Sequence, residues 1–289
     1  MRRLTDVLNA RPKDRVIATP GVYDMVSLRM AAAMGFEALY MTGYGTVASH
    51  LGLPDAGLAS YADMVGRVEA MARMAETPLI ADGDTGYGGL LNVRHTVRGY
   101  ERAGAAAIQL EDQEFPKKCG HTPDRRVVAA DEMVRKIAVA VEARASPDFL
   151  IIARTDARTS LGLMEAIRRA RACTEAGADM LFVESPETED EMVTIGRELG
   201  DKPLVANMVE GGRTPVLSNA RLAEIGYALA IYPVAGLLSA AAALETVYRR
   251  IRETGSSQGS TAPVYRFAEM NRLMGFEEVL RFDRDHAEI

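Results

Sequence analysis

Tryptophan is absent from this 289-residue chain, and cysteine occurs only twice, as Cys119 and Cys173. Two cysteines cannot build a disulfide framework, so we expect a reducing compartment, the cytoplasm. The chain also lacks an apolar run of the ~20 residues that a membrane span requires. Its first residues carry no apolar run of the kind found in signal peptides. We therefore expect neither a disulfide-rich secreted domain nor a membrane protein.

An excess of basic residues is lacking as well. The chain has 34 Lys and Arg residues against 40 Asp and Glu residues, which gives a formal net charge of −6. A nucleic-acid-binding surface needs a basic patch, and this balance argues against one. A small anionic substrate can still bind, through a metal ion or a few placed arginines. With 48% apolar and 26% charged residues, the composition is that of a folded globular protein.

Short apolar runs alternate with helical patterns along most of the chain. The expected strands are residues 16–19, 38–42, 78–82, 106–111, 149–154, 180–184, 203–207 and 228–232, and helices are expected at 25–34, 93–102, 131–143, 163–175 and 190–199. Most of these strands are continuously apolar, which is typical of parallel strands buried on both faces. The pattern predicts an α/β fold, a (β/α)8 TIM-type barrel over residues 1–239, followed by a helical extension over 240–289.

Polar residues fall at the ends of six of the eight expected strands. They are Thr42, Asp82, Glu111, Arg154, Glu184 and Asn207. In a (β/α)8 barrel the carboxyl ends of the strands converge on one face, where active sites are built. The sequence therefore predicts a functional site that combines these six positions.

Two carboxylates, Asp82 and Asp84, flank Gly83 at one strand end, and Glu111 ends the next strand. Hard oxygen ligands of this kind favour Mg²⁺ over zinc. The alternative is that Asp82-Gly83-Asp84 forms only a turn. The convergence of a third carboxylate on the same face favours the metal site.

A long loop follows the fourth strand and contains Lys117-Lys118-Cys119-Gly120-His121. Two lysines and a histidine beside the cysteine indicate a lowered thiol pKa and a role as acid or base. Long loops on this face often act as lids. The alternative is a solvated basic loop with an incidental cysteine. In either case we expect both lysines to face solvent.

Arg154 ends an apolar run, so its charge needs a carboxylate partner or an anionic ligand. Glu184 or Asp156 could be a structural partner, and the ligand remains the alternative. The glycine-rich segments 42–45 and 207–215 offer backbone N–H groups or mobile loops at the same face.

Several segments in chain order resemble the isocitrate lyase/phosphoenolpyruvate mutase superfamily. They are the Lys117–His121 run and residues 42–45, 51–55, 82–86, 110–113, 153–157 and 206–210. The Lys-Lys-Cys-Gly-His run resembles the signature of the lyase branch. The resemblance covers roughly residues 10–250.

The resemblance implies a magnesium-dependent barrel, with Mn²⁺ as a possible substitute, that makes or breaks a bond at C3 of α-oxygenated carboxylates. It implies metal binding by Asp82 and Asp84, directly or through water, with Asp55 and Glu111 in support. The implied carboxylate-binding residues are Tyr40, Thr42, Gly43, Tyr44, Gly120, Arg154 and Asn207. Cys119 would act as the general acid, with His121, Lys117 and Glu184 near it. The family also implies homotetramers with exchanged C-terminal helices.

Departures from the family pattern bear on the substrate. Methylisocitrate lyases bind a third carboxylate with basic residues after the eighth strand, whereas residues 234–240 here carry no charge. This favours a dicarboxylate of the 2,3-dimethylmalate type over a tricarboxylate. Pro233 occupies the position where oxaloacetate hydrolases of the family tend to have serine, which argues against oxaloacetate hydrolysis. Carboxyphosphonoenolpyruvate phosphonomutases share the Cys-Gly-His loop and the 231–233 segment, so they remain an alternative, as does a non-catalytic anion-binding barrel.

Overall fold

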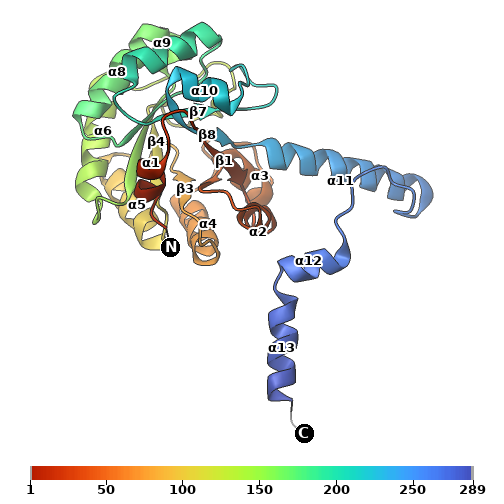
Figure 1. Ribbon diagram of the computed structural model, residues 1–289. Helices are drawn as coiled ribbons and strands as arrows, with labels where there is room; N and C mark the ends of the chain where they lie inside the picture. The colour runs from red at the N-terminus through yellow and green to blue at the C-terminus, as the bar shows by residue number, and fades with distance from the viewer. Residues whose placement is uncertain (1, 288–289) are drawn as a thin grey trace.

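A closed barrel of eight parallel strands, hydrogen-bonded in chain order, forms the body of the molecule (Figure 1). The computed structural model describes residues 2–287. The strands are β1 (Ile17–Val22), β2 (Leu39–Met41), β3 (Leu79–Asp82), β4 (Ala107–Glu111), β5 (Leu150–Thr155), β6 (Met180–Val183), β7 (Leu204–Asn207) and β8 (Tyr227–Tyr232). Parallel pairing of β1 with β8 closes the barrel. The predicted (β/α)8 fold is confirmed.

All eight predicted strands are present, and β1 departs most from its predicted bounds. The predicted strand ends at Thr19, before Pro20-Gly21. In the structure, β1 continues to Val22, which pairs with Met41 of β2. The absence of a side chain at Gly21 is needed here, because a Cβ would lie 2.3 Å from the carbonyl oxygen of Pro233. The chain after β8 therefore packs directly on β1.

Helices surround the barrel and connect its strands. They are α1 (Leu4–Ala10), α2 (Met25–Ala33), α3 (Gly43–Leu51), α4 (Tyr61–Met74), α5 (Leu90–Ala103), α6 (Ala130–Ala143), α7 (Ala157–Leu161), α8 (Leu163–Glu175), α9 (Glu189–Leu199) and α10 (Asn219–Ile225). The five predicted helices correspond to α2, α5, α6, α8 and α9. Residues 42–45, expected as a glycine-rich loop, instead begin α3. Thr42 makes this possible, because its hydroxyl accepts a hydrogen bond from the Gly45 amide (3.5 Å) as the N-cap.

Two layers of apolar side chains hold the barrel together. The larger layer lies between the sheet and the helices, and the smaller one fills the barrel interior. Leu4 and Val7 of α1 are fully buried and belong to the interior layer. They pack with residues at the beginnings of the strands, such as Ile17, so α1 closes the N-terminal end of the barrel. The barrel interior is therefore closed at this end.

The C-terminal helices leave the barrel (Figure 1). They are α11 (Ala235–Thr254), α12 (Phe267–Leu273) and α13 (Phe276–His286), and none contains a buried residue. The predicted division at residue 239 falls inside α11. Within the predicted helical extension, α12 and α13 are separated at Gly275, which has a φ of 89°. Among residues 2–287, no helix is long and apolar enough to cross a membrane.

Candidate active site

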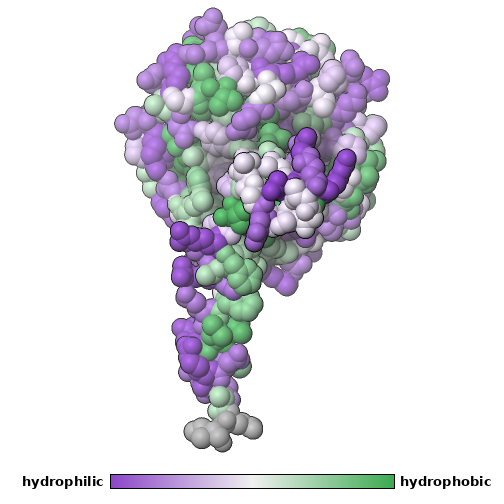
Figure 2. All heavy atoms as spheres, turned by 90° about the vertical axis from the view of Figure 1, so that its right-hand side faces the viewer, coloured by the Kyte–Doolittle hydropathy of each residue, from purple (hydrophilic) through white to green (hydrophobic). Residues whose placement is uncertain are grey.

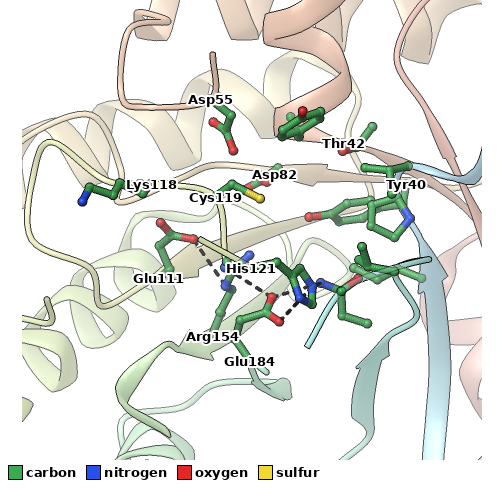
Figure 3. Close-up of a pocket in the computed structure, with 18 of the residues that line it drawn as sticks. Tyr40, Thr42, Asp55, Asp82, Glu111, Lys118, Cys119, His121, Arg154 and Glu184 are labelled. Atoms are coloured by element: carbon green, nitrogen blue, oxygen red, sulfur yellow. Dashed lines mark hydrogen bonds and ion pairs between the residues drawn. The ribbon is translucent and has the colours of Figure 1, made fainter. Parts of the chain in front are cut away.

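A cavity of about 220 Å³ lies at the carboxyl ends of the barrel strands (Figure 3). Its lining includes Tyr40, Thr42, Tyr44, Asp55, Asp82, Glu111, Lys117, Cys119, Gly120, His121, Arg154, Glu184 and Asn207. These are thirteen of the site residues expected from the sequence. Gly43 and Asp84 are not part of the lining. All six polar residues at the predicted strand ends line this cavity, so their predicted convergence is confirmed.

Asp82 lies at the end of β3, facing the first turn of α3. Its Oδ1 accepts a hydrogen bond from the backbone N–H of Asp84 (3.1 Å). A Cβ on Gly43 would lie 2.7 Å from Asp82 Oδ2, so only glycine lets the helix approach this closely. The N-terminus of a helix carries unpaired N–H groups and a partial positive charge. An anionic group beside Asp82 would therefore meet the N–H groups of α3.

Lys117 is buried, contrary to the expectation that both loop lysines face solvent. Its ammonium group pairs with Asp55 and with Asp84, at 2.5 Å from Asp84 Oδ1. Burial would lower the pKa of Lys117, but the carboxylates of Asp84 and Asp55 outweigh burial and raise it well above its usual value. Burial raises the pKa of Asp84 to about 7, against the opposing effect of Lys117. Only Lys118 is exposed as expected.

Arg154 is surrounded by carboxylates on the floor of the pocket. Asp156 accepts two hydrogen bonds from it, from Nε (2.9 Å) and Nη2 (3.0 Å). Glu111 and Glu184 each lie within 3.4 Å of the same guanidinium. Burial would raise the pKa of Glu184, but Arg154 and His121 lower it to about 2. Asp156 and Glu184, the two structural partners considered for Arg154, therefore both contact it. Binding of an anionic ligand by Arg154 remains a prediction.

Glu111 differs from Glu184 in having a free oxygen. Burial raises the pKa of Glu111 well above its usual value, against the effect of Arg154. Its Oε1 is buried and has no hydrogen-bond partner among residues 2–287. Buried carboxylate oxygens without a partner are costly unless a cation or proton satisfies them. Glu111 therefore offers an open donor for a metal ion or its bound water.

The structure does not form a closed metal cage. Within the described part of the chain, no group of three or more His, Cys, Asp or Glu side chains is arranged to hold a metal ion. Asp84 and Asp55 are instead engaged by Lys117. Asp82 and Glu111 line the pocket and remain available. Mg²⁺ usually takes one or two protein carboxylates and keeps several waters, so this donor set fits it.

Cys119 points into the pocket from the loop between β4 and α6, residues 112–129, which we call the Cys119 loop (Figure 3). Its backbone N–H donates to the carbonyl oxygen of Asp55 (3.1 Å). Burial raises the pKa of the Cys119 thiol to about 11. The expected lowering of this pKa is wrong, because Lys117 turns away to pair with carboxylates and the thiol is desolvated. At neutral pH the thiol stays protonated, so it is suited to act as an acid.

His121 and Asn207 form the wall beside Glu184. His121 Nδ1 accepts a hydrogen bond from the Arg213 amide (3.1 Å), and its Nε2 lies 3.2 Å from Asn207 Nδ2 and 3.5 Å from Glu184 Oε1. Burial lowers the pKa of His121, so the ring is neutral at neutral pH. Asn207 Nδ2 donates to Glu184 Oε2 (3.0 Å), while its Oδ1 is buried without a partner within residues 2–287. This free acceptor suits a ligand hydroxyl.

Sequence reasoning missed part of the pocket wall. The additional lining residues are Lys118, Val209, Glu210, Gly211, Gly212, Ile231, Pro233, Val234 and Leu238. Ile231, Pro233, Val234 and Leu238 form an apolar wall at the end of β8 and the start of α11. The absence of charge in residues 234–240 indicated this wall, and the glycine-rich segment 207–215 was expected at this face, but neither observation predicted that Val209 lines the pocket.

A barrel pocket that combines carboxylates, a buried arginine and a thiol has the side chains of an enzyme site suited to a small organic anion. The family model for phosphoenolpyruvate phosphomutase matches residues 8–252. The chain belongs to the phosphoenolpyruvate mutase/isocitrate lyase superfamily.

Three curated relatives have different names. The chain is 47% identical to 2,3-dimethylmalate lyase of Eubacterium barkeri, covering 94% of each chain. It is 40% identical to 2-methylisocitrate lyase of Aeropyrum pernix, covering 94% of this chain and 87% of the relative. It is 39% identical to the chloroplastic carboxyvinyl-carboxyphosphonate phosphorylmutase of Arabidopsis thaliana, covering 91% and 78%. The relatives therefore include both carbon–carbon lyases and a phosphorus-transferring enzyme.

Solved structures of similar proteins contain small carboxylates. Oxaloacetate acetylhydrolase in complex with 3,3-difluorooxalacetate superposes with a TM-score of 0.92 at 36% identity, covering 99% of this chain and 97% of that one. Phosphonopyruvate hydrolase in complex with oxalate and Mg²⁺ superposes with a TM-score of 0.87 at 30% identity, covering 100% of both. Relatives with this fold thus bind short carboxylates, and one of them contains magnesium.

Proposed function

We propose that this protein is a Mg²⁺-dependent carbon–carbon lyase that cleaves C2–C3 of a substituted 2-hydroxydicarboxylate of the 2,3-dimethylmalate type. The products are pyruvate and a second carboxylate, propionate for 2,3-dimethylmalate itself. The observation that carries this proposal is the division of the pocket into a charged side and an apolar wall. Asp82, Glu111 and Arg154 lie on the charged side, and Ile231 and Leu238 belong to the wall.

The charged side would hold the pyruvate half of the substrate. Arg154 keeps Nη1 free of hydrogen bonds within residues 2–287, because Nε and Nη2 are taken by Asp156. The N-terminus of α3, beginning at Gly43, supplies N–H groups for a carboxylate. Asn207 Oδ1 would accept a hydrogen bond from the C2 hydroxyl. These three elements fix the position of C2 relative to Cys119.

The apolar wall would accept the alkyl group on C3. Lys117, Lys118 and Arg154 are the Lys and Arg residues of the lining; Lys117 is already paired, and no basic residue lies on the wall. A third carboxylate, as in methylisocitrate, would meet Val234 and Leu238 with no cation to balance it. Burying an unpaired charge is costly. The wall therefore favours a methyl-substituted dicarboxylate.

Asp82 and Glu111 would hold Mg²⁺, with Asp84 and Asp55 in support through water. When bound, Mg²⁺ polarises the C2 oxygen and lowers the pKa of the hydroxyl that must be deprotonated. Mn²⁺ fits the same oxygen donors. Asp55 and Asp84 are held in place by Lys117, so they remain ordered around the position of the ion.

Cys119 would complete the reaction as the general acid. Cleavage of C2–C3 leaves its electron pair on C3, and the hydroxyl proton passes to a water molecule as C2 becomes the keto carbon of pyruvate. The thiol of Cys119 gives its proton to C3, so one proton leaves and one arrives. A pKa of about 11 keeps this thiol protonated before cleavage. Glu184, Lys117 and His121 would hold the surrounding charges in place.

A pyruvate-coupled assay tests this function. We expect lactate dehydrogenase and NADH to report pyruvate from 2,3-dimethylmalate, with at least about 10-fold lower kcat/KM for 2-methylisocitrate because a third carboxylate would be unpaired. Faster turnover of methylisocitrate would contradict the assigned substrate class. Absence of pyruvate from every methyl-substituted malate and isocitrate would contradict the lyase itself.

Carboxyphosphonoenolpyruvate phosphonomutase is the alternative function. The relative of 39% identity named for carboxyvinyl-carboxyphosphonate favours it, as does the shared Cys119-Gly120-His121 segment. Phosphorus NMR of a reaction with carboxyphosphonoenolpyruvate separates the two, because only the mutase produces a new P–C resonance. Binding of an anion without any turnover would favour the third possibility, a non-catalytic barrel.

We also propose that the enzyme is a cytoplasmic homo-oligomer, a tetramer with exchanged C-terminal helices. Both cysteines are free thiols, in keeping with a reducing compartment. Apolar side chains of α13, among them Phe276, Leu280 and Phe282, are more than half exposed. Figure 2 shows apolar surface along this projecting segment. A second copy of the chain would cover it.

A further inference from the structure

The carboxylate of Asp156 is buried outside the lining of the pocket and accepts hydrogen bonds from several side chains. It follows β5 and is 0% exposed. Besides its two hydrogen bonds from Arg154, Oδ1 accepts one from Arg125 Nη1 and one from Gln113 Nε2 (3.3 Å). A single carboxylate thus contacts three side chains. Two of them, Gln113 and Arg125, belong to the Cys119 loop.

Gln113 and Arg125 come from opposite ends of the Cys119 loop. Gln113 lies at its start, and its side chain donates to the carbonyl oxygen of Lys118 (2.8 Å) and accepts from the Lys118 amide (3.0 Å). Arg125 lies near its end, with a fully buried side chain. Gln113 and Val127 pair as an antiparallel bridge, which closes the base of the loop. Asp156 therefore contacts both ends of the segment that carries Cys119.

Ser185 connects the middle of the loop to the same cluster. Its hydroxyl donates to the carbonyl oxygen of Gly120 (2.8 Å) and lies 3.4 Å from Arg125 Nη2. Ser185 follows Glu184 directly and has a positive φ of 57°, an uncommon backbone conformation for serine. The residue beside Cys119 is thus held by a residue that Arg125 also contacts.

The carboxylate of Asp156 also determines which nitrogen of Arg154 is available to a ligand. Glu111 and Glu184 are the other acidic neighbours of this guanidinium, at 3.4 and 3.3 Å. The bidentate geometry on Nε and Nη2 is the strong form of this contact and leaves Nη1 for another anion. If Asp156 lost its charge or moved, Glu111 and Glu184 would become the main partners of Arg154.

We propose that Asp156 is a positioning residue that transmits the seating of the Cys119 loop to Arg154. When the loop is seated, Arg125 and Gln113 fix Asp156, and Asp156 presents Arg154 Nη1 to the substrate carboxylate. Coupling between two sites is reciprocal, so a carboxylate bound at Arg154 stabilises the seated loop. The inference rests on the proposed function only in assigning a carboxylate to Arg154.

Arg125→Met and Asp156→Asn test the proposal, with Gln113→Ala as a milder variant should either of these fail to fold. Two quantities are measured: oxalate affinity by calorimetry in MgCl₂, and hydrogen exchange of residues 113–127 without ligand. We expect about 10-fold or weaker oxalate binding and faster exchange in each variant, although Arg125 is not part of the pocket lining. Arg125→Lys, which keeps the charge, should recover part of both.

Arg144→Met is the matched control. Arg144 pairs with Asp179 at the opposite end of β5 and contacts neither the loop nor the pocket. It should lower stability without changing oxalate affinity or loop exchange. Faster exchange with unchanged oxalate affinity would overturn the transmission to Arg154, and unchanged exchange would overturn the anchoring of the loop. If the wild-type protein itself binds no oxalate, the carboxylate site fails, and loop exchange alone still decides on the anchoring.

Discussion

At the scale of single residues, burial sets the chemistry of the pocket more than sequence neighbours do. Lys117, Lys118 and His121 stand next to Cys119 in sequence, and this composition indicates a lowered thiol pKa. In the folded chain Lys117 pairs with Asp55 and Asp84, and desolvation raises the thiol pKa. Sequence spacing identifies the residues, but the direction of each side chain depends on tertiary contacts that spacing does not encode.

Alkylation of Cys119 measures its pKa directly. With a pKa of about 11, about one thiol in a thousand is ionised at pH 8. We expect the iodoacetamide reaction rate to rise about 10-fold per pH unit between pH 8 and 10. The same shift makes the fold less stable as pH rises from the ordinary thiol pKa towards 11, because the unfolded chain ionises first. A rate plateau below pH 9 would contradict the raised pKa. Cys173→Ser removes the other thiol as a control.

Replacing Cys119 tests its role as the acid. Cys119→Ser should lower kcat for pyruvate formation by about 10² to 10⁴, the usual contribution of a general acid, with a small change in KM. Circular dichroism should show an unchanged fold. Cys173→Ser, at a buried position in α8, should retain kcat. Full activity of Cys119→Ser would remove the thiol from the mechanism.

Gly120, in the Cys119 loop, packs closely against Arg154 and Glu184. A Cβ there would lie 2.3 Å from Arg154 Nη2 and 2.8 Å from Glu184. Gly120→Ala should therefore keep the loop from seating and lower kcat/KM by about 10-fold or more. Gly89→Ala is the control, because a Cβ at Gly89 meets nothing within 4 Å. Equal kinetics for the two variants would show that the loop can seat in another way.

At the scale of elements, the strands are easier to predict than α3, the helix whose first turn lies at the pocket. Short apolar runs identify all eight strands, and six of them end in the polar residues that predict the site. The consecutive residues Gly43, Tyr44 and Gly45 have weak helix propensity. The helix α3 nevertheless begins with them, because Thr42 is its N-cap. A cap hydrogen bond and a close approach to Asp82 override propensity here. The uncharged segment 234–240 indicated an apolar surface near the site, but its packing beside Val209 was not predicted, since Val209 and Leu238 come from segments far apart in sequence.

Helix α1 closes the end of the barrel opposite the site, and its loss should cost stability rather than activity. Leu4 is fully buried, so Leu4→Ala should reduce the free energy of unfolding by about 2 to 4 kcal/mol. Urea unfolding measures this change. Leu91→Ala, at a position that is 76% exposed, should have almost no effect. A large loss of kcat/KM in folded Leu4→Ala enzyme would show that the end of the barrel closed by α1 also affects the site at the opposite end.

At the scale of the whole molecule, the C-terminal helices expose apolar side chains that a second copy of the chain would cover under the proposed assembly. Phe267 and Val264 are about four-fifths exposed, and large exposed apolar patches mark interaction sites. A double variant, Leu280→Glu with Phe282→Glu, should shift the mass measured by light scattering from tetramer towards smaller species. Arg281→Glu, at a charged position between them, is the control. A monomeric wild-type protein would contradict the proposed exchange.

The central claim is that acidic side chains around a magnesium ion and a protonated thiol split a methyl-substituted malate. Pyruvate release from 2,3-dimethylmalate, before and after removal of metal with EDTA, tests it most directly. We predict that activity disappears with EDTA and returns with added MgCl₂, while Asp82→Asn stays inactive at ordinary Mg²⁺ concentrations. Pyruvate release that continues at the same rate in metal-free enzyme would contradict the account.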